Sequence, residues 1–274
     1  MPTSTELPDA RVDGSRGRSG HTKAARLHHI AESVREHGFV TVDVLAAELG
    51  VSRMTIHRDL DELQARSVLR KVRGGASAER TTTFESDFEY RANALLAEKR
   101  AIARVAATFA NDGDVVVVGD SSTTSHVVPY LLDLENVTII TNFLPVMETV
   151  SRASGVSLIA LGGQFHPQYR SFLGLLCEQA LADLYADIMF ASSSALLGTE
   201  VFHQDEPVVK VKQAMMRASR TRVLMLDHTK LGHGALHRVG PVTEFTHVVV
   251  DERADSDQVA QIRDAGVEVL VVPL

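Results

Sequence analysis

Apolar residues recur at helical spacing in the first part of the chain. Between His21 and Gly38 they stand at Leu27, Ile30 and Val34, which predicts a helix that the glycine ends. The short β-prone stretch 39–42 follows. These features predict a small domain that starts with a helix and continues into a short extended segment.

Two more helices are expected directly afterwards. Residues 44–49 form a short apolar helix that ends at Gly50, because glycine adopts the positive φ of such a turn at little cost. Ser52 is a good N-cap for the next helix. Its inward stripe, at i, i+4 and i+7, consists of Ile56, Leu60 and Leu63. Residues 69–72, followed by Gly74 and Gly75, predict a β-hairpin.

After about residue 98 the pattern changes to alternating strands and helices. Apolar, β-branched runs indicate strands at 115–118, 137–140, 156–161, 223–226, 248–250 and 267–272. Helices are expected at 98–110, 123–132, 143–152, 173–185, 208–218 and 256–265. Such alternation is typical of a Rossmann-like α/β domain with a mainly parallel sheet and helices on its faces. Residues 78–98 lack a clear apolar period and are interpreted as a linker that runs into a helix.

The helix–turn–helix order followed by an Arg-rich hairpin favours a winged helix-turn-helix domain that binds DNA. The exposed face of a helix can reach base edges in the major groove, while hydroxyl groups commonly hold phosphates. A small helical bundle with a solvated basic face is the simpler alternative. The residues expected to contact DNA are Ser52, Arg53, Thr55, His57, Arg58 and, on the wing, Arg70, Lys71 and Arg73.

The charge distribution agrees with this interpretation, although the net charge of −7 taken alone does not. Residues 1–76 hold twelve basic and ten acidic side chains, and residues 77–274 hold sixteen and twenty-five. Phosphate affinity depends on the local patch rather than on the global sum. A mildly basic N-terminal part followed by an acidic remainder is typical of a DNA-binding domain joined to a separate sensor domain.

Polar side chains follow several of the expected strands. Residues 120–124 lie between a strand and a helix, where backbone N–H groups, hydroxyls and the helix dipole would suit an anion. Polar or glycine pairs recur at 141–142 and 162–163, and Lys230 follows a later strand. Because ligands bind open α/β sheets at the carboxyl ends of strands, these segments are expected to converge. The plainer alternative is that residues 121–124 only cap a helix.

The N-terminal segment resembles the DNA-binding domain of the DeoR-type transcriptional regulators over about residues 22–77. The matching segments are 26–30, Gly38, 45–46, 49–52, 55–56, 58–60, Leu63 and 73–76. Two positions depart from the family pattern. His57 stands where the family usually has arginine, and Ser67 stands where it usually has glycine. His57 is shorter and usually neutral, so base preference should differ.

The rest of the chain is similar to the effector domain of the same family, with a match that reaches about residue 250. The matching segments are 111–114, 120–124, 138–142, 161–163, Gly174, 186–187, Phe190, Gly198 and 226–230. The resemblance implies a fold related to ribose-5-phosphate isomerase and a phosphorylated sugar or related metabolite as effector. The effector ligands that it implies are Asp120, Ser122, Thr123, Thr124, Thr141, Asn142, Gly162, Gly163 and Lys230.

Departures in the effector domain concern the particular ligand. The family commonly has glycine at the position of Ser122, serine at that of Thr229 and a glutamate near Val208, where the nearest acid is Glu206. Residues 192–194 are serines in place of a more glycine-rich segment. A polar site is still expected, but these changes leave the identity of the sugar open.

Other chemistry has weaker support. The histidines are scattered, and no metal site or other cofactor is expected. Cys177 lies in an apolar segment and is interpreted as a core thiol, while the single cysteine excludes an internal disulfide and suits a reducing cytoplasm. No apolar run is long enough for a membrane span. A sugar-phosphate isomerase-like enzyme, using Asp120, Asp227 and Lys230, is the alternative function, and a DNA-architectural protein is a third.

Together these patterns predict four parts: a disordered tail at 1–21, a winged helix-turn-helix at 22–77, a linker at 78–98 and an effector-sensing α/β domain at 99–274. The expected function is repression of a carbohydrate-catabolism operon in the cytoplasm. Its partners would be double-stranded operator DNA and a phosphorylated sugar that releases the protein from that DNA. A homo-oligomer is expected, because repeated half-sites require more than one reader.

Overall fold

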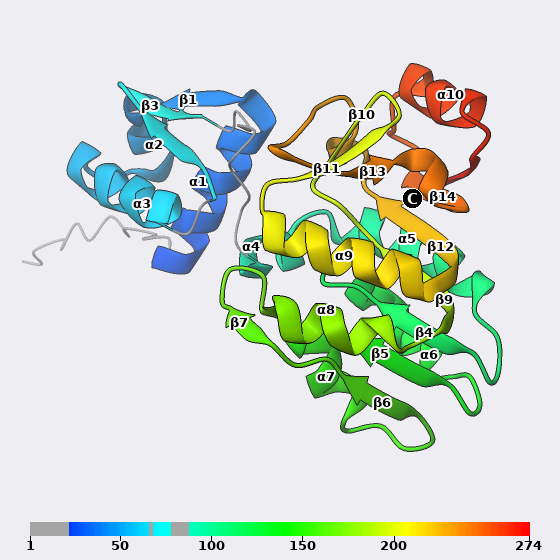
Figure 1. Cartoon of the computed structure of the whole chain (residues 1–274). Helices are drawn as coiled ribbons and strands as arrows, with labels where there is room; N and C mark the ends of the chain where they lie inside the picture. Colours follow the sequence, from blue (N-terminus) through cyan, green and yellow to red (C-terminus); the bar gives the residue numbers. More distant parts are fainter. Residues whose placement is uncertain (1–21, 66–67, 78–87) are drawn as a thin grey trace, which may run out of the picture.

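The computed structural model describes residues 22–65, 68–77 and 88–274. The predicted tail at 1–21, Ser67 and residues 78–87 of the predicted linker lie outside these residues. A small N-terminal domain and a larger α/β domain are joined through two consecutive helices, α4 (Phe88–Asn93) and α5 (Leu96–Ala106) (Figure 1). Thus the predicted linker runs into helices, and α5 starts three residues before the predicted start of the large domain at residue 99.

The small domain has the predicted helices and hairpin. Its elements are α1 (Lys23–His37), β1 (Phe39–Thr41), α2 (Val42–Leu49), α3 (Arg53–Ala65), β2 (Arg70–Val72) and β3 (Gly75–Ser77). The strands form an antiparallel sheet in the order β1-β3-β2. Gly50 ends α2 at φ +63°, as the sequence indicates. The core includes the fully buried Ile30, Leu45, Ile56 and Leu60, so the predicted apolar stripes are confirmed.

A buried ion pair, which the periodicity did not reveal, joins α1 to α3. Arg26 Nε lies 2.5 Å from Asp59 Oδ2, and its terminal nitrogen donates to Oδ1 at 3.0 Å. The Asp59 side chain is only 3% exposed. The hydrogen bond to Asp59 raises the pKa of Arg26 above its usual value. This two-point contact fixes the angle between the first and third helices, and so the direction in which the outer face of α3 points.

The large domain is built on a seven-stranded sheet in which every pairing is parallel. Its order is β15-β14-β12-β9-β4-β5-β6. The strands are β4 (Val115–Val118), β5 (Thr138–Thr141), β6 (Ser157–Ala160), β9 (Ala186–Ala191), β12 (Ser219–Leu226), β14 (His247–Asp251) and β15 (Glu268–Val272). The predicted parallel α/β fold is therefore confirmed, except that the central strand β9 was missed.

Helices cover both faces of this sheet (Figure 1). One face packs against α5, η2 (Thr124–Val127), α6 (Val128–Leu131) and α7 (Leu144–Val150). The other packs against α8 (Leu175–Ala182), α9 (Glu206–Ala218) and α10 (Ser256–Asp264). Strands such as β4 bury residues toward both layers, which explains their continuous apolar runs.

Small strands and turns that the sequence patterns did not reveal complete the domain. They are β7 (Gln164–His166), β8 (Ser171–Leu173), β10 (Ala195–Leu197), β11 (Glu200–His203) and β13 (His237–Pro241), with the 3₁₀ turns η1 (Ala107–Phe109), η3 (His228–Lys230) and η4 (Val242–Glu244). Of these, β10 follows the carboxyl end of β9 and η3 follows that of β12, whereas η1 precedes β4 and η4 precedes β14. Within the described residues, no helix is long and apolar enough to cross a membrane.

The strand order creates a topological switch point in the middle of the sheet. From β4 the chain proceeds outward through β5 and β6, then returns to β9 on the other side of β4 and continues through β12. Loops that leave β4 and β9 therefore diverge toward opposite faces. A crevice at the carboxyl ends of such strands is the usual ligand site of an open α/β sheet.

Candidate DNA-reading surface and effector cavity

The outer face of α3 is exposed and polar. Arg53, His57 and Arg58 all project away from the core of the small domain. Ser52 caps the helix: its hydroxyl accepts from the Thr55 N–H at 3.1 Å and bonds the Thr55 hydroxyl at 2.9 Å. The two residues expected to position phosphates therefore also organise the start of α3, and their contact with DNA stays a prediction.

Ion pairs tie two of the predicted DNA contacts to neighbouring elements. Arg53 pairs with Asp43 on α2, and Lys71 on β2 lies 2.5 Å from Asp61 on α3. The Lys71 N–H also donates to Gln64 at 2.8 Å. The two contacts of Lys71 hold the wing against α3, and the pair with Asp43 holds Arg53 against α2. Lys71 and Arg53 would therefore present their cations to DNA from fixed positions.

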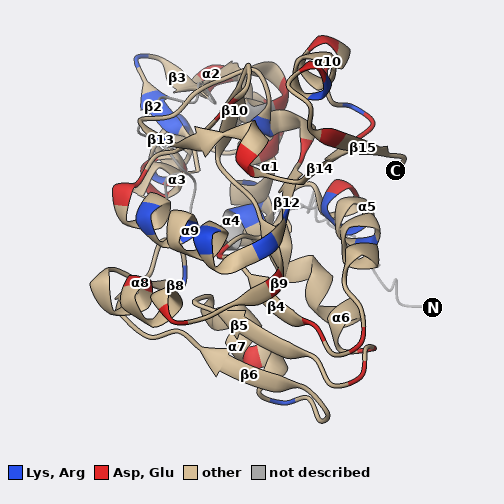
Figure 2. Cartoon of the chain, turned by 45° about the vertical axis from the view of Figure 1, so that its right-hand side comes forward, with Lys and Arg blue, Asp and Glu red and all other residues tan. Residues whose placement is uncertain are grey.

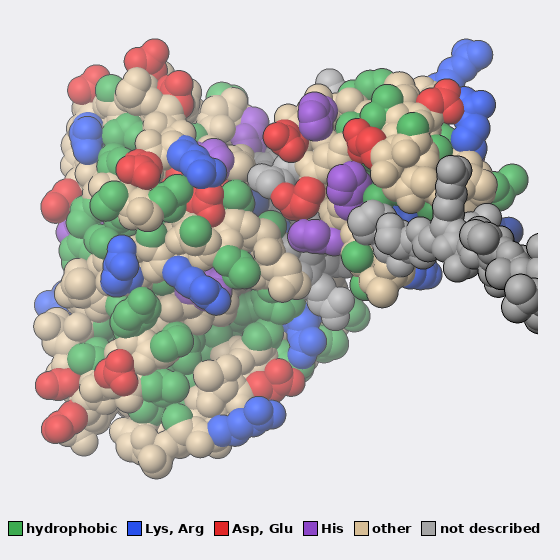
Figure 3. Space-filling model, turned by 180° about the vertical axis from the view of Figure 1, so that it is seen from behind, with side chains coloured by type: hydrophobic (Ala, Val, Ile, Leu, Met, Phe, Trp, Pro, Cys, Tyr) green, Lys and Arg blue, Asp and Glu red, His purple; other side chains and the backbone are tan. Residues whose placement is uncertain are grey.

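Alternation along β2 separates the wing residues. Lys71 faces α3, whereas Arg70 lines a cavity between the two domains. Arg73 is exposed in the turn that follows. Gly75 has no room for a side chain, because a Cβ there would lie 2.2 Å from the Val40 carbonyl oxygen. Basic side chains project from the outer end of the small domain (Figure 3), while basic and acidic positions are interspersed along the ribbon of the large domain (Figure 2).

The cavity measures about 810 Å³ and lies over the switch point of the large sheet. Its floor comes from the loop after β4, the loop after β9 and the start of η3. Of the predicted effector ligands, it is lined by Asp120, Ser122, Thr123 and Lys230. The expected convergence of strand ends therefore holds for β4 and β12. Residues 141–142 after β5 and residues 162–163 after β6 are not among the described residues that line the cavity.

The remaining predicted ligands have roles within the fold and do not line the cavity. The Thr124 hydroxyl donates to the carbonyl of Gly119 at 2.6 Å, and that of Thr141 donates to Val118 at 2.7 Å. Asn142 donates to the Phe172 carbonyl at 3.0 Å, although its Oδ1 is buried without a partner in the described part of the chain.

Of the two glycines after β6, Gly163 has a role within the fold. Gly163 has φ +145°, and a Cβ there would lie 2.5 Å from the Leu173 carbonyl oxygen, so this position allows β7 to approach β8. Gly162 has open space around it. The expected helix at 123–132 is in fact the 3₁₀ turn η2 and the single turn α6. The predicted dipole of a long helix is therefore lacking at the Asp120 loop.

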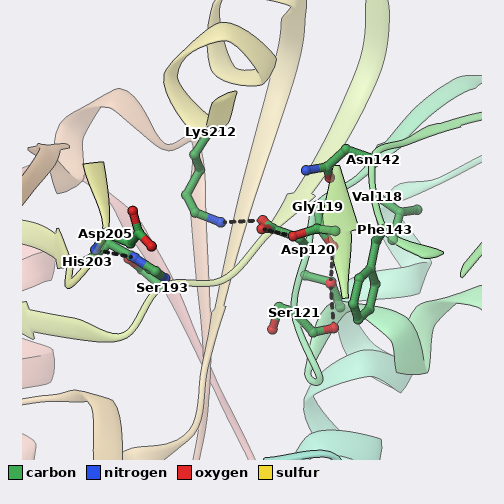
Figure 4. Close-up of polar contacts among 12 residues, drawn as sticks. Val118, Gly119, Asp120, Ser121, Asn142, Phe143, Ser193, His203, Asp205 and Lys212 are labelled. Atoms are coloured by element: carbon green, nitrogen blue, oxygen red, sulfur yellow. Dashed lines mark hydrogen bonds and ion pairs between the residues drawn. The ribbon is translucent and has the colours of Figure 1, made fainter. Parts of the chain in front are cut away.

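A buried ion pair lies at the centre of the cavity. Lys212, on α9, donates to Asp120 Oδ1 at 3.3 Å, and each side chain is only 2% exposed (Figure 4). Asp120 also accepts from the Ser171 hydroxyl at 3.2 Å. Lys212 was not predicted as a ligand, since a lysine in a helix usually faces solvent. One signal was available: it shares a stripe with the buried Val208 and Met215 at i, i+4 and i+7.

Other lining residues were not among the predicted ligands, although the serines at 192–194 had been singled out as a departure from the family pattern. Residues 192–194, which follow β9, are three buried serines, and the Ser193 hydroxyl donates to the Phe202 carbonyl at 2.6 Å. Lys99 is 3% exposed and its amine donates to the Arg91 carbonyl. Among the described residues, five lysines and arginines and two acids line the cavity, so this part of its lining suits an anion.

Cys177 lies beside this site but belongs to the core. It is fully buried, and its burial, with the nearby Asp120 and Glu178, raises the pKa of the thiol to about 12. A neutral thiol is a poor nucleophile. The predicted core role of this residue is therefore confirmed. Within the described chain, no group of three His, Cys, Asp or Glu side chains is arranged to hold a metal ion.

Comparison with known families divides the chain at the same place as the structure. Residues 26–82 match the model of the DeoR-like helix-turn-helix domain, and residues 95–252, more than half of the chain, match that of the DeoR C terminal sensor domain. The lactose phosphotransferase system repressor of Staphylococcus aureus (strain N315) is 31% identical over 88% of this chain and 96% of its own. The putative aga operon transcriptional repressor of Escherichia coli O157:H7 is 28% identical over 90% and 93%.

Solved structures give only a partial likeness. A D-ribose-5-phosphate isomerase in complex with phospho-erythronic acid aligns with a TM-score of 0.37 at 13% identity, over 48% of this chain and 52% of its own. The aligned part thus spans about half of each molecule. At this level of similarity no role for any residue follows from the alignment.

Proposed function

Because the chain belongs to the DeoR family of transcriptional regulators, we propose that it represses a carbohydrate-catabolism operon and leaves the operator when a phosphorylated sugar or related metabolite binds its cavity. The family is one of regulators, so the isomerase-like enzyme considered above is not supported. A cytoplasmic location and a homo-oligomer are part of the proposal, because the target is chromosomal DNA with repeated half-sites.

The buried Asp120–Lys212 pair is the observation that best supports a phosphorylated sugar as the effector. A buried lysine can donate to a phosphate, and a buried carboxylate can accept from the hydroxyls of a sugar. The cavity volume lies within the range of small-molecule sites. The excess of cations over acids favours a ligand that carries negative charge, and the hydroxyls of residues 121–123 and 192–194 offer further hydrogen bonds.

We infer that α4 couples the cavity to the DNA reader, because Arg91 of this helix lines the cavity and the helix lies between the two domains in the chain. The amine of Lys99 holds the Arg91 carbonyl, and the Arg91 guanidinium lies 5.7 Å from the centre of the Tyr169 ring. Phe88 packs edge-on against Phe143 with ring centres 5.2 Å apart. A ligand that prefers one placement of this segment would shift the reader with it, and operator DNA would reciprocally weaken ligand binding.

A thermal-shift screen tests the effector. The full chain should be stabilised by one or more sugar phosphates and not by the matching unphosphorylated sugars, since binding to the native state raises the midpoint. The double variant Asp120→Asn, Lys212→Met, which leaves neither charge of the buried pair uncompensated, should lose this response. Lys210→Met is the matched control, because Lys210 lies on the same helix but is exposed and paired with Glu206. Absence of stabilisation by any phosphorylated metabolite would contradict the proposed effector class.

Lys230 lines the same cavity and gives a second test. Lys230→Ala should retain DNA affinity yet need a higher concentration of the stabilising sugar phosphate for release, because one cation has been removed. Release is measured as loss of a labelled duplex from the protein. A dose response equal to that of the unaltered chain would remove Lys230 from the effector site.

The DNA-reading role is tested on duplexes selected from a random pool by the full chain. Arg58→Ala should lose about 1–3 kcal/mol of specific binding at matched salt, as expected for a side chain that reads a base. Arg220→Ala, which removes another exposed arginine, from the large domain, is the control for net charge. Equal losses in the two variants would mean that Arg58 contributes only to the general electrostatic attraction.

A further inference from the structure

Met54 is an exposed methionine on the otherwise polar outer face of α3. Its side chain is 63% exposed, whereas the apolar residues of the core stripe are buried. It precedes His57 and Arg58 by three and four residues, so these three side chains are neighbours on the helix surface. Single exposed apolar residues are ordinary on proteins. The position of this one, in the first turn of the proposed reading helix, is what gives it significance.

The polar neighbours of Met54 are engaged within the protein. Arg53 pairs with Asp43, and the hydroxyls of Ser52 and Thr55 bond each other. By contrast, the structure shows no hydrogen bond or ion pair between the side chain of His57 or Arg58 and any other described residue. The side chains presented outward from the start of α3 are therefore an apolar one followed by two potential hydrogen-bond donors.

The major groove offers a matching pattern. Each base presents donors or acceptors there, and thymine adds a C5 methyl group that apolar side chains recognise. Methionine suits this contact because its unbranched, polarizable chain adapts to irregular surfaces. We propose that Met54 packs against the C5 methyl of a thymine next to the bases that Arg58 and His57 face. This assignment rests on the proposed DNA-reading role of α3.

Deoxyuridine provides the test, because it lacks only the methyl group and keeps the hydrogen-bonding edge of thymine. A duplex selected from a random pool by the full chain is remade with each thymine replaced singly by deoxyuridine. One position in each half-site should weaken binding about fourfold, the effect of one methyl group removed from water. Met54→Ala should weaken binding to the unmodified duplex by at least that much and show no further loss at the same deoxyuridine.

Val44→Ala is the matched control, because Val44 is an exposed apolar residue on α2 of the same domain. This variant should keep the full deoxyuridine response. The Met54 variant should unfold at about the same temperature as the unaltered chain, since Met54 is largely exposed and is not part of the apolar core of the small domain. Retention of the deoxyuridine loss in Met54→Ala would overturn the assignment, because the methyl group would then be recognised by another residue.

The remaining outcomes distinguish failure of the Met54–thymine contact from failure of the proposed DNA-reading role of α3. A selected duplex that tolerates deoxyuridine everywhere would overturn the role of Met54 and leave the DNA reader intact. An equal loss by Met54→Ala on the modified and unmodified duplexes, with the deoxyuridine penalty retained, would indicate a contact with protein or sugar instead and would also overturn it. Failure to enrich any duplex would refute the DNA-reading role and the Met54 contact together.

Discussion

Replacing Lys212 by methionine should strongly destabilise the large domain. The substitution keeps most of the side-chain volume but leaves the Asp120 carboxylate, 2% exposed, without the cation that lies 3.3 Å away. Breaking a buried pair on one side costs about 3–5 kcal/mol, since the remaining charge is desolvated and uncompensated. The Ser171 hydroxyl, which still donates to Asp120 at 3.2 Å, offsets part of this cost.

Removing both charges should restore stability. In the double variant Asp120→Asn, Lys212→Met the shapes are kept and no buried charge is left, and such replacements are often neutral or stabilising. If the single variant lost 4 kcal/mol, the urea midpoint would fall by roughly 2 M at an m-value of about 2 kcal/mol/M. The double variant should recover most of this loss even though it no longer binds a sugar phosphate.

The assay is urea unfolding of the full chain followed by circular dichroism, with Lys210→Met as the control. Lys210 is exposed, so its pair with Glu206 is screened by water and its loss should hardly move the midpoint. A loss of less than about 1 kcal/mol for Lys212→Met, typical of ordinary substitutions, would contradict the expected cost of leaving the Asp120 carboxylate without its cation. A double variant as unstable as the single one would contradict it equally.

Two further predictions concern titratable groups outside the ion pair. Cys177 should resist alkylation by iodoacetamide at pH 8 in the native protein and react readily in guanidinium chloride, because burial raises its pKa to about 12; rapid native labelling would contradict this. His126 has a pKa below its usual 6.5, first because of burial and then because of Lys99 and Arg100, so the unfolded chain takes up a proton there before the folded one. Stability should therefore fall as pH drops below 6.5, and His126→Gln should reduce this loss in urea unfolding at about pH 7 and pH 5; parallel losses would exclude His126 as the cause.

The small domain could be predicted from local signals. Ser52 caps α3 through contacts within three residues, Gly50 provides the positive φ that ends α2, and the stripe at Ile56 and Leu60 marks the core face. Each of these depends on neighbours along the chain. The pair between Arg26 and Asp59 could not be read in this way, because the two residues are joined only when α1 packs across α3.

The central strand β9 shows where local signals fail in the large domain. Its sequence begins with alanine and aspartate and contains only one β-branched residue, Ile188, so it lacks the run that marks β4 or β14. Its place comes from pairing with β4 on one side and β12 on the other. Because β9 was not predicted, the sequence could not locate the switch point or place the serines at 192–194 at the end of a central strand.

The sequence by itself determined the class of fold, the position of the reader and the hydroxyl-rich loop after β4, since apolar period, caps and motif order are properties of neighbouring residues. The tertiary structure alone decided which polar groups share a cavity. Lys212 lies opposite Asp120, whereas Lys210, two residues away, is exposed to solvent. Thr124 and Thr141 instead bond backbone carbonyls, and Gly163 allows two strands to approach each other. The physical reason is that desolvation, charge pairing and close backbone approach depend on three-dimensional surroundings, which segments far apart in the chain supply together.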